Sequence, residues 1–316
     1  MSNKLYFWAE KYLFSPSFFD KILSFVLLPL TAIYCFLTFL KKTFSQEEDF
    51  KIPVISIGNL IVGGSGKTPV TIELAKRYEK VTVILRGYKR KSKGLVVVSM
   101  FGKILTDIDK SGDEAMLLAL SLPKATVIVS EDRKQAIKKA KEMGTKVIFL
   151  DDGFSKFDIK KFDILLKPDM KLLPFCLPSG AYRFAPSNYK KADMIMRENK
   201  DFKRVVKIEN KTEKMVLLTA ISKPQRLEEF VEKDIPKIYL PDHSDFSKEF
   251  INDIYLKYNP TSILTTTKDA VKLKPYNLNL SIMKLDIEID ENKIKIIDNY
   301  IRKYDAKKSS DSKYPS

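Results

Sequence analysis

Cysteine, histidine and tryptophan are scarce in this chain of 316 residues. Only two cysteines are present: Cys35 lies in an apolar segment, and Cys176 lies far along the polar body. They give no disulfide framework, and they fit a reducing cytoplasm. The single histidine, His243, stands in "KIYLPDHSDF", in a loop after an apolar run. A lone histidine is more often structural, but loops at strand ends commonly present catalytic groups.

Long apolar runs are also rare, because only residues 22–40 form one without a charge. The run is just long enough to span a hydrocarbon core, and aromatic residues flank it as at membrane interfaces. Lys41 and Lys42 follow directly and indicate that the body of the chain is cytoplasmic. No small-residue cleavage site follows, so a secretory signal is not favoured. We predict a membrane anchor; because Pro29 would bend a helix here, a partly inserted hairpin stays open, as does a buried core helix.

Acidic residues are outnumbered, since 56 Lys and Arg against 40 Asp and Glu give a formal net charge of +16. The charges balance within residues 1–50, so the excess lies in residues 51–316. Such a body favours nucleic acid, anionic lipid head groups or phosphorylated substrates. Basic residues do not gather with aromatic stacking positions in a recognisable module, so we expect no nucleic acid partner. The alternative is a lysine-rich composition without functional meaning.

Internal repeats are absent, and the length is that of about two domains. Apolar, β-branched segments alternate with helix-forming segments, which predicts an α/β fold: a mainly parallel sheet flanked by helices, with a second, smaller α/β lobe and an N-terminal membrane helix. The predicted parts are an anchor with its linker (1–50), a domain with a phosphate-binding loop (51–210), a smaller lobe (211–304) and a disordered tail (305–316).

The predicted strands are residues 52–57, 81–88, 125–130, 146–154, 162–167, 192–196, 204–208, 215–220, 237–240 and 262–266. The predicted helices are residues 71–78, 111–122, 132–143, 224–232, 246–258 and a closing helix after 290. Ser111 with Glu114 three residues later predicts a capping box. Residues 168–190 carry four of the 15 prolines. A connection this long is expected to shape a site.

One glycine is missing where a phosphate-binding loop needs it. In "SIGNLIVGGSGKTPVTIELAKRY", Gly66, Lys67 and Thr68 fit the strict pattern, but Ile61 stands where its first glycine should be. The stretch nevertheless lies between a predicted strand and a predicted helix, as the pattern requires. It is close to the Lys-Gly-Gly-x-Gly-Lys-Thr loop of one branch of P-loop proteins, with Val62 in place of the extra lysine. The alternative is a glycine-rich turn without a ligand.

ATP is the predicted ligand of this loop. Its glycines let backbone N–H groups curl around an anion, and the following helix adds its positive dipole end. Lys67 would reach the β- and γ-phosphates, and Thr68 would hold Mg²⁺. The predicted ATP-binding residues are Ile61, Val62, Gly63, Gly64, Ser65, Gly66, Lys67 and Thr68.

Carboxylates stand at two further positions where chemistry is expected. "KVIFLDDGF" ends a strand with Asp151 and Asp152, and an aspartate there holds Mg²⁺ in P-loop enzymes. We predict Asp151 as the metal ligand, with Asp152 as a second candidate; a strand-end cap before a turn is the alternative. Asp113 and Glu114 begin a helix, where capping and dipole stabilisation alone would account for them.

Seven motifs in a fixed order resemble the tetraacyldisaccharide 4'-kinase family of lipid A biosynthesis. They are "GNLIVGGSGKTP", "RGY", "GDE", "DDGF", "LPSGAYRFAP", "PDHSDF" and "TTKDAVKL". The resemblance runs from the apolar segment to near residue 300, and the family's loop also lacks the first glycine. It implies transfer of the γ-phosphoryl group of ATP, with Mg²⁺, to the 4'-hydroxyl of an acylated, 1-phosphorylated glucosamine disaccharide. It also implies a place at the inner membrane with the body on the cytoplasmic face, and we expect a monomer.

The same resemblance suggests roles for individual residues. Asp113 in "GDE" would be the base for the sugar hydroxyl, aided by His243 in "PDHSDF". Arg183 in "LPSGAYRFAP" is the basic counterpart of the family's arginine. Arg86 and Tyr88, in the basic loop "LRGYKRKSKG", are candidate substrate contacts, with a solvated turn as the alternative.

The chain departs from the family pattern at two places. Ser155 and Lys156 follow "DDGF" where the family usually has Gln-His, and "DHS" stands where the family has "DHH". These changes leave the nucleotide site intact and bear on lipid contacts. The alternative function is a membrane-associated P-loop ATPase that positions partner proteins; it would need no lipid acceptor, and His243 would be dispensable.

Overall fold

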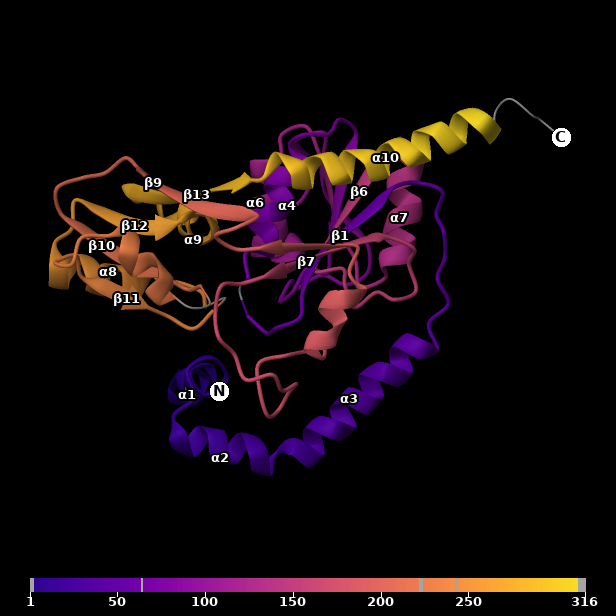
Figure 1. Ribbon diagram of the computed structural model, residues 1–316. Helices are drawn as coiled ribbons and strands as arrows, with labels where there is room; N and C mark the ends of the chain where they lie inside the picture. Colours follow the sequence, from indigo (N-terminus) through magenta and orange to yellow (C-terminus); the bar gives the residue numbers. More distant parts are fainter. Residues whose placement is uncertain (1–2, 64, 222–223, 243, 312–316) are drawn as a thin grey trace. The chain divides into compact units, whose positions relative to one another are not determined.

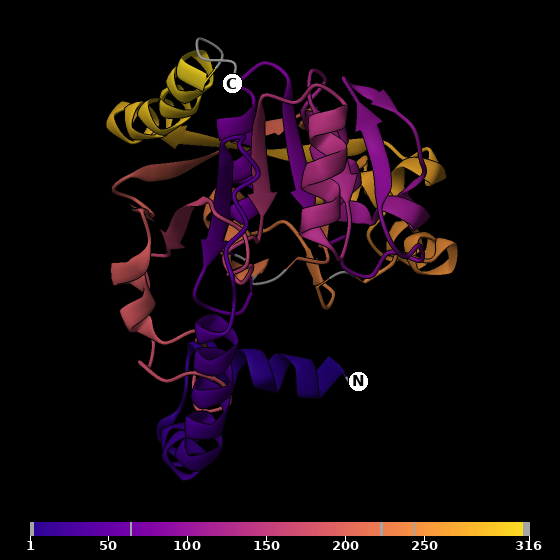
Figure 2. The same cartoon turned by 90° about the vertical axis from the view of Figure 1, so that its right-hand side faces the viewer.

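A computed structural model of the chain (Figures 1 and 2) describes residues 3–63, 65–221, 224–242 and 244–311. It forms two compact units, each built around its own β-sheet. The larger unit comprises Glu10–Lys203 with Glu288–Ser316, and the smaller comprises Met1–Ala9 with Arg204–Ile287.

Eight strands form the sheet of the larger unit, in the spatial order β4-β3-β5-β2-β6-β1-β7-β8. Their bounds are β1 (Val54–Asn59), β2 (Val81–Leu85), β3 (Val96–Met100), β4 (Lys103–Ile104), β5 (Thr126–Val129), β6 (Val147–Asp151), β7 (Phe162–Lys167) and β8 (Met194–Arg197). The strands from β5 to β8 in this order pair in parallel, whereas β3 pairs antiparallel with both β4 and β5. The predicted mainly parallel sheet is confirmed.

Helices cover both faces of this sheet because its central strands are buried on both sides. Every residue of β1, β2 and β6 is buried. Helices α4 (Lys67–Ala75) and α6 (Asp113–Ser121) lie on one side of β1 and β6, and α7 (Arg133–Glu142) lies on the other (Figure 1). Figure 2 shows α7 across the strands, where its apolar residues join those of β1, β2, β5 and β6 in one core. Apart from the helices that precede β1, the described part of this unit also contains α5 (Ile108–Ser111), η1 (Pro186–Lys191) and α10 (Glu291–Asp311).

The start of α6 differs from the prediction, and the capping box at Ser111 is wrong. Ser111 ends α5, and the N-cap of α6 is Gly112, which makes no side-chain cap bond. Gly112 has a φ of 82°, a left-handed value that glycine adopts readily and that lets the chain turn between the two helices. The predicted helix 71–78 also starts earlier, at Lys67, directly after the phosphate-binding loop.

The apolar run at 22–40 is divided between two helices. They are α2 (Phe18–Val26) and α3 (Leu28–Thr43), which follow α1 (Asn3–Phe14). The bend between α2 and α3 is 58°, and a proline lies in the first turn of α3. Among the described residues no single helix is long and apolar enough to cross a membrane, although the bent pair has the necessary combined length and composition. Many large apolar side chains of the pair are exposed, including Phe18, Phe19, Phe25, Ile33, Phe36 and Phe39.

The smaller unit has a five-stranded sheet in the order β11-β10-β12-β13-β9. Its elements are β9 (Phe202–Glu209), β10 (Met215–Thr219), η2 (Pro224–Phe230), β11 (Lys237–Tyr239), α8 (Lys248–Tyr258), β12 (Ser262–Thr266), α9 (Thr267–Leu273), η3 (Lys274–Tyr276) and β13 (Leu280–Ile289). Strands β11, β10, β12 and β13 pair in parallel, which confirms a second α/β lobe. Residues 224–232 were expected to be α-helical and form the 3₁₀ helix η2.

Candidate nucleotide-binding and catalytic site

The candidate site forms at the carboxyl ends of β1 and β6, which are neighbours in the sheet. Their parallel register pairs Ile57 with Asp151, so the loop after β1 begins beside the turn after β6. The hydroxyl of Thr68 donates to Asp151 Oδ2 at 2.9 Å, and that of Thr71 donates to Oδ1 at 3.3 Å. Crevices at the carboxyl ends of parallel strands are where open α/β sheets bind ligands.

The loop itself has the backbone conformation that an anion cradle needs. Gly63 and Gly66 both have a φ of 82°, which glycine adopts without strain. Gly66 is the N-cap of α4 and makes no side-chain cap bond, so Lys67 and Thr68 occupy the first helical turn with its unpaired N–H groups. Gly64 lies outside the described residues.

Ile61, which stands where the strict pattern has a glycine, fixes the start of the loop. Ile61 is 1% exposed and forms an isolated antiparallel bridge with Tyr182. The next residue, Val62, donates its N–H to the carbonyl of Ala181 at 2.9 Å. The start of the loop is thus bonded as a short strand to the proline-rich segment 168–190, and an apolar side chain suits this position better than glycine.

Arg183 brings the same segment into the site. Its Nη1 donates to Asp152 Oδ2 at 3.2 Å, and its Nη2 donates to Asp152 Oδ1 at 3.0 Å and to Asn59 Oδ1 at 2.6 Å. The ammonium of Lys67 lies 3.4 Å from Asn59 Oδ1 and 3.9 Å from Asp152 Oδ1. Two cations and one carboxylate therefore share the mouth of the loop.

The adjacent aspartates have pKa values displaced in opposite directions. Burial, and next the negative charge of Glu114, raise the pKa of Asp151 to about 7. Burial also acts to raise the pKa of Asp152, but Lys67 and Arg183 together hold it at about 2. Near neutral pH, Asp152 is an anion, whereas Asp151 titrates and would ionise when a cation is placed beside it.

Thr68 and Asp151 have the chemistry of a magnesium site. Mg²⁺ prefers hard oxygen ligands, keeps several waters and is usually held by one or two carboxylates with substrate phosphates. A hydroxyl and a carboxylate oxygen 2.9 Å apart at the end of a phosphate-binding loop fit that description. The part of the chain that the structure describes contains no group of three His, Cys, Asp or Glu able to hold a metal ion without a phosphate ligand.

The other residues predicted for the site are Asp113, Arg86, Tyr88 and His243. Asp113 is the first residue of α6 and is buried, and its Oδ1 accepts the N–H of Glu114 at 3.1 Å. Arg86 and Tyr88 follow β2 and are exposed. His243 lies outside the described residues, so its pairing with Asp113 stays a prediction.

Three residues of the site were not predicted from the sequence: Asn59, Thr71 and Arg133. Arg133 begins α7 and is 3% exposed. Burial lowers the pKa of its guanidinium to about 10 against the raising effect of Asp152 and Asp151, which places a buried cation near both carboxylates. The sequence feature that could have identified Arg133 is its position soon after the apolar strand at 125–130. Asp151 was predicted from the same kind of position.

A strand, a glycine-rich loop and a helix that present a lysine and a threonine beside a strand-end aspartate define a P-loop protein of the nucleotide-binding class. The family model described as tetraacyldisaccharide-1-P 4'-kinase (LpxK) matches residues 23–215 and 200–302. The chain belongs to this family.

Curated relatives agree with the family match. The tetraacyldisaccharide 4'-kinase of Aliarcobacter butzleri is 59% identical over 92% of this chain and 96% of the relative. The tetraacyldisaccharide 4'-kinase of Helicobacter acinonychis is 49% identical over 93% of this chain and 95% of the relative. Among solved structures, LpxK from Aquifex aeolicus in complex with ATP is similar with a TM-score of 0.73 and 27% identity, over 88% of this chain and 99% of that one.

Proposed function

We propose that this protein transfers the γ-phosphoryl group of ATP to the 4'-hydroxyl of tetraacyldisaccharide 1-phosphate in lipid A biosynthesis. The observation that carries this proposal is the contact of Thr68 with Asp151 beside Lys67, in a chain of the tetraacyldisaccharide 4'-kinase family. Phosphoryl transfer depends mainly on positioning and on charge neutralisation. We also propose that the enzyme acts as a monomer.

ATP binds with its phosphates in the loop between β1 and α4. The backbone N–H groups around Gly63 and Gly66 and the first turn of α4 face the anion. Lys67 contacts the β- and γ-phosphates. Its ammonium lies 3.4 Å from Asn59 Oδ1 and 3.9 Å from Asp152 Oδ1, which keeps it at the mouth of the loop.

In this proposal Thr68 and Asp151 would hold Mg²⁺, which would supply positive charge against the charge that develops on the phosphates. Asp151 is the better ligand of the two aspartates, because its partners are the hydroxyls of Thr68 and Thr71, which rotate easily. Asp152 is engaged by both guanidinium nitrogens of Arg183. Its role is to position Arg183 and Lys67 toward the phosphates.

Asp113 accepts the proton of the attacking sugar hydroxyl. Its place at the N-terminus of α6 favours the charged carboxylate through the helix dipole. The buried position limits competition from water. His243 orients this carboxylate or moves its proton onward.

The helices α2 and α3 place the enzyme at the cytoplasmic face of the inner membrane as a bent, partly inserted pair. The segment 168–190 is bonded to the neighbouring helices: Tyr34 OH on α3 donates to the carbonyl of Arg183 at 3.0 Å, and Tyr12 OH on α1 donates to that of Pro178 at 3.1 Å. The exposed apolar side chains of α2 and α3 are then free to enter lipid. A full crossing would instead carry these backbone contacts into hydrocarbon, where irregular backbone is unfavourable.

The direct test is an assay with purified protein, radiolabelled ATP and the disaccharide 1-phosphate lipid, scored for a newly phosphorylated lipid. Lys67→Ala and Thr68→Ala should each lower turnover by about 100-fold or more, because each removes a contact to phosphate or metal. Lys76→Ala, at the exposed end of α4, serves as the control. Near-normal turnover in either loop variant would contradict the nucleotide-site assignment.

A further inference from the structure

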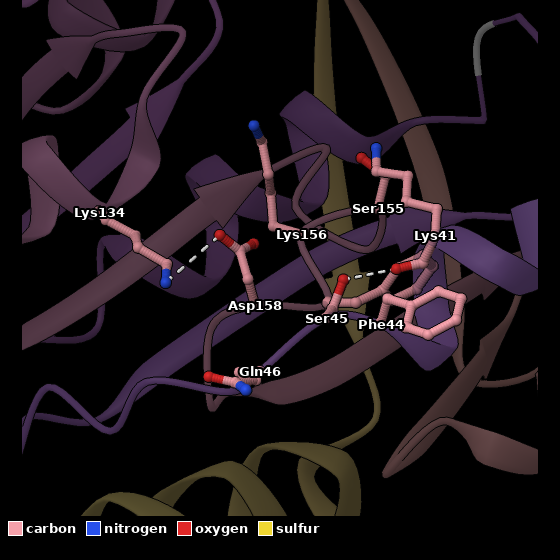
Figure 3. Close-up of a pocket in the computed structure, with 9 residues that line it drawn as sticks. Lys41, Phe44, Ser45, Gln46, Lys134, Ser155, Lys156 and Asp158 are labelled. Atoms are coloured by element: carbon pink, nitrogen blue, oxygen red, sulfur yellow. Dashed lines mark hydrogen bonds and ion pairs between the residues drawn. The ribbon is translucent and has the colours of Figure 1, made fainter.

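A basic pocket lies at the end of α3, on the turn that follows β6. Its volume is about 490 Å³ (Figure 3). Its walls come from three places: Lys41 and Ser45 at the end of α3, Lys134 on α7, and Ser155, Lys156 and Asp158 from the turn. All of these residues belong to the larger unit.

Only one of the three lysines in this pocket is neutralised by carboxylates. Lys134 lies 3.5 Å from Asp158 and 3.2 Å from Glu48. Lys156 donates to the backbone carbonyl of Glu131 at 3.2 Å. Within the described part of the chain, no carboxylate forms an ion pair with Lys41 or Lys156. Figure 3 shows these two side chains extending to the same side, while Lys134 turns toward Asp158.

The surroundings of Lys156 disfavour its own charge. Burial lowers the pKa of its ammonium, and the positive charges of Arg133 and Lys41 lower it further, against the raising effect of Asp158. An anion bound in the pocket would reverse this penalty by pairing with Lys41 and Lys156. The hydroxyl of Ser155 supplies an additional donor to oxygen, whereas that of Ser45 donates to the carbonyl of Lys41 at 2.6 Å.

We propose that this pocket binds the phosphate group of a membrane lipid. Its location supports a lipid rather than a soluble ligand, because Lys41 follows the exposed apolar face of α3 and the neighbouring Phe44 is 79% exposed. Cations at the end of an inserted helix lie at the depth of lipid head groups. Two lipids carry a phosphate group. One is the 1-phosphorylated acceptor, and this choice rests on the proposed function. The other is an anionic phospholipid, and this choice is independent of the proposed function.

The test compares Lys156→Gln and the double variant Lys41→Gln/Lys156→Gln with Lys138→Gln. Lys138 is a matched control because it lies on α7, is 63% exposed and pairs with Glu48 outside the pocket. One measurement is co-sedimentation of the full chain with phosphatidylcholine vesicles that contain or lack phosphatidylglycerol. The other is the split of kcat and KM for the disaccharide 1-phosphate lipid in mixed micelles. Thermal unfolding checks that each variant is folded.

Each pocket lysine should contribute roughly five-fold to affinity, as a lysine near an anionic surface does. A raised KM with unchanged kcat and unchanged vesicle binding identifies the acceptor's phosphate as the occupant. Loss of the phosphatidylglycerol-dependent binding with unchanged KM identifies a phospholipid. If neither quantity differs from that of Lys138→Gln, the proposal is overturned. A wild-type protein without kinase activity would contradict the proposed function, while the vesicle measurement would still decide the pocket.

Discussion

At the scale of single residues, the neighbouring aspartates Asp151 and Asp152 have the same side chain but different hydrogen-bond partners, which give them different roles. Asp152 has a φ of 54°, which turns its carboxylate away from the strand direction and toward Arg183. Asp151 keeps the strand conformation and accepts hydrogen bonds from two threonine hydroxyls. One carboxylate is therefore fixed in an ion pair, and the other remains available to a cation.

Asp113 and His243 provide the sharpest prediction at this scale, because a base and its partner should not act independently. The double variant Asp113→Ala/His243→Ala should be about as slow as Asp113→Ala alone, since the histidine then has nothing to orient. His243→Ala alone should be milder and lose about 10²–10³-fold in turnover. ATP affinity should survive in all three variants, because the phosphate-binding loop is a separate segment.

The measurements are turnover and ATP affinity for the two single variants and the double variant. Multiplicative losses in turnover would mean that the two residues act separately. Wild-type turnover in Asp113→Ala would show that Asp113 is not the catalytic base.

At the scale of elements, the main feature is the contact between α3 and the segment 168–190. The hydroxyl of Thr31 lies 2.7 Å from Ser179 Oγ and 3.3 Å from the carbonyl of Cys176, and it accepts the N–H of Ser179 at 3.2 Å. Tyr34, one turn further along α3, bonds to the carbonyl of Arg183. The helix that we propose to contact lipid is thereby connected to the arginine that contacts Asp152.

Thr31→Val should destabilise this contact while preserving side-chain shape. Both Thr31 and Ser179 are buried, so the lost hydroxyl leaves polar groups without a partner, at a cost of about 1–3 kcal/mol. Thermal unfolding measures the loss, and limited proteolysis of residues 168–190 reports whether the segment is released. Thr38→Val is the matched control, because among the described residues the hydroxyl of Thr38 bonds only to the carbonyl of Cys35 on its own helix. Equal melting temperatures and equal protection in the two variants would show that Thr31 does not fasten the segment.

At the scale of the whole molecule, attachment to the membrane can come from the apolar faces of α2 and α3 or from the net charge of +16. These two sources respond differently to salt, because electrostatic attachment is screened and apolar insertion is not. The bent pair exposes phenylalanines along both helices, which favours insertion.

Deletion of residues 1–44 should therefore release the protein from membranes or leave it poorly soluble, and should lower activity on lipid presented in bilayers. The poor solubility follows from exposing the surface that α3 covers, including the buried Cys176. Cell fractionation and activity on vesicles measure the effect, with a high-salt wash of the full chain as the control. Full membrane retention after the deletion would point to the basic surface as the main attachment.

The sequence by itself determined the local features of this protein. The parallel sheet follows from buried apolar runs alternating with helix-forming segments, and the phosphate-binding loop follows from glycines ahead of Lys67 and Thr68. Asp151 could be predicted as well, because a polar residue at the end of an apolar strand lies at the edge of the sheet. These features depend on neighbours within a few residues, so a short window of sequence contains them.

Only the tertiary structure decided the contacts between distant segments. The bridge of Ile61 with Tyr182, the pairing of Arg183 with Asp152 and the burial of Arg133 depend on which strands are neighbours. The division of residues 22–40 into two helices depends on their bonds to the segment 168–190 as well as on the proline that the sequence shows. Hydrophobic periodicity specifies which face of an element is buried but not the partner that buries it, and that partner decides where each charge is paired.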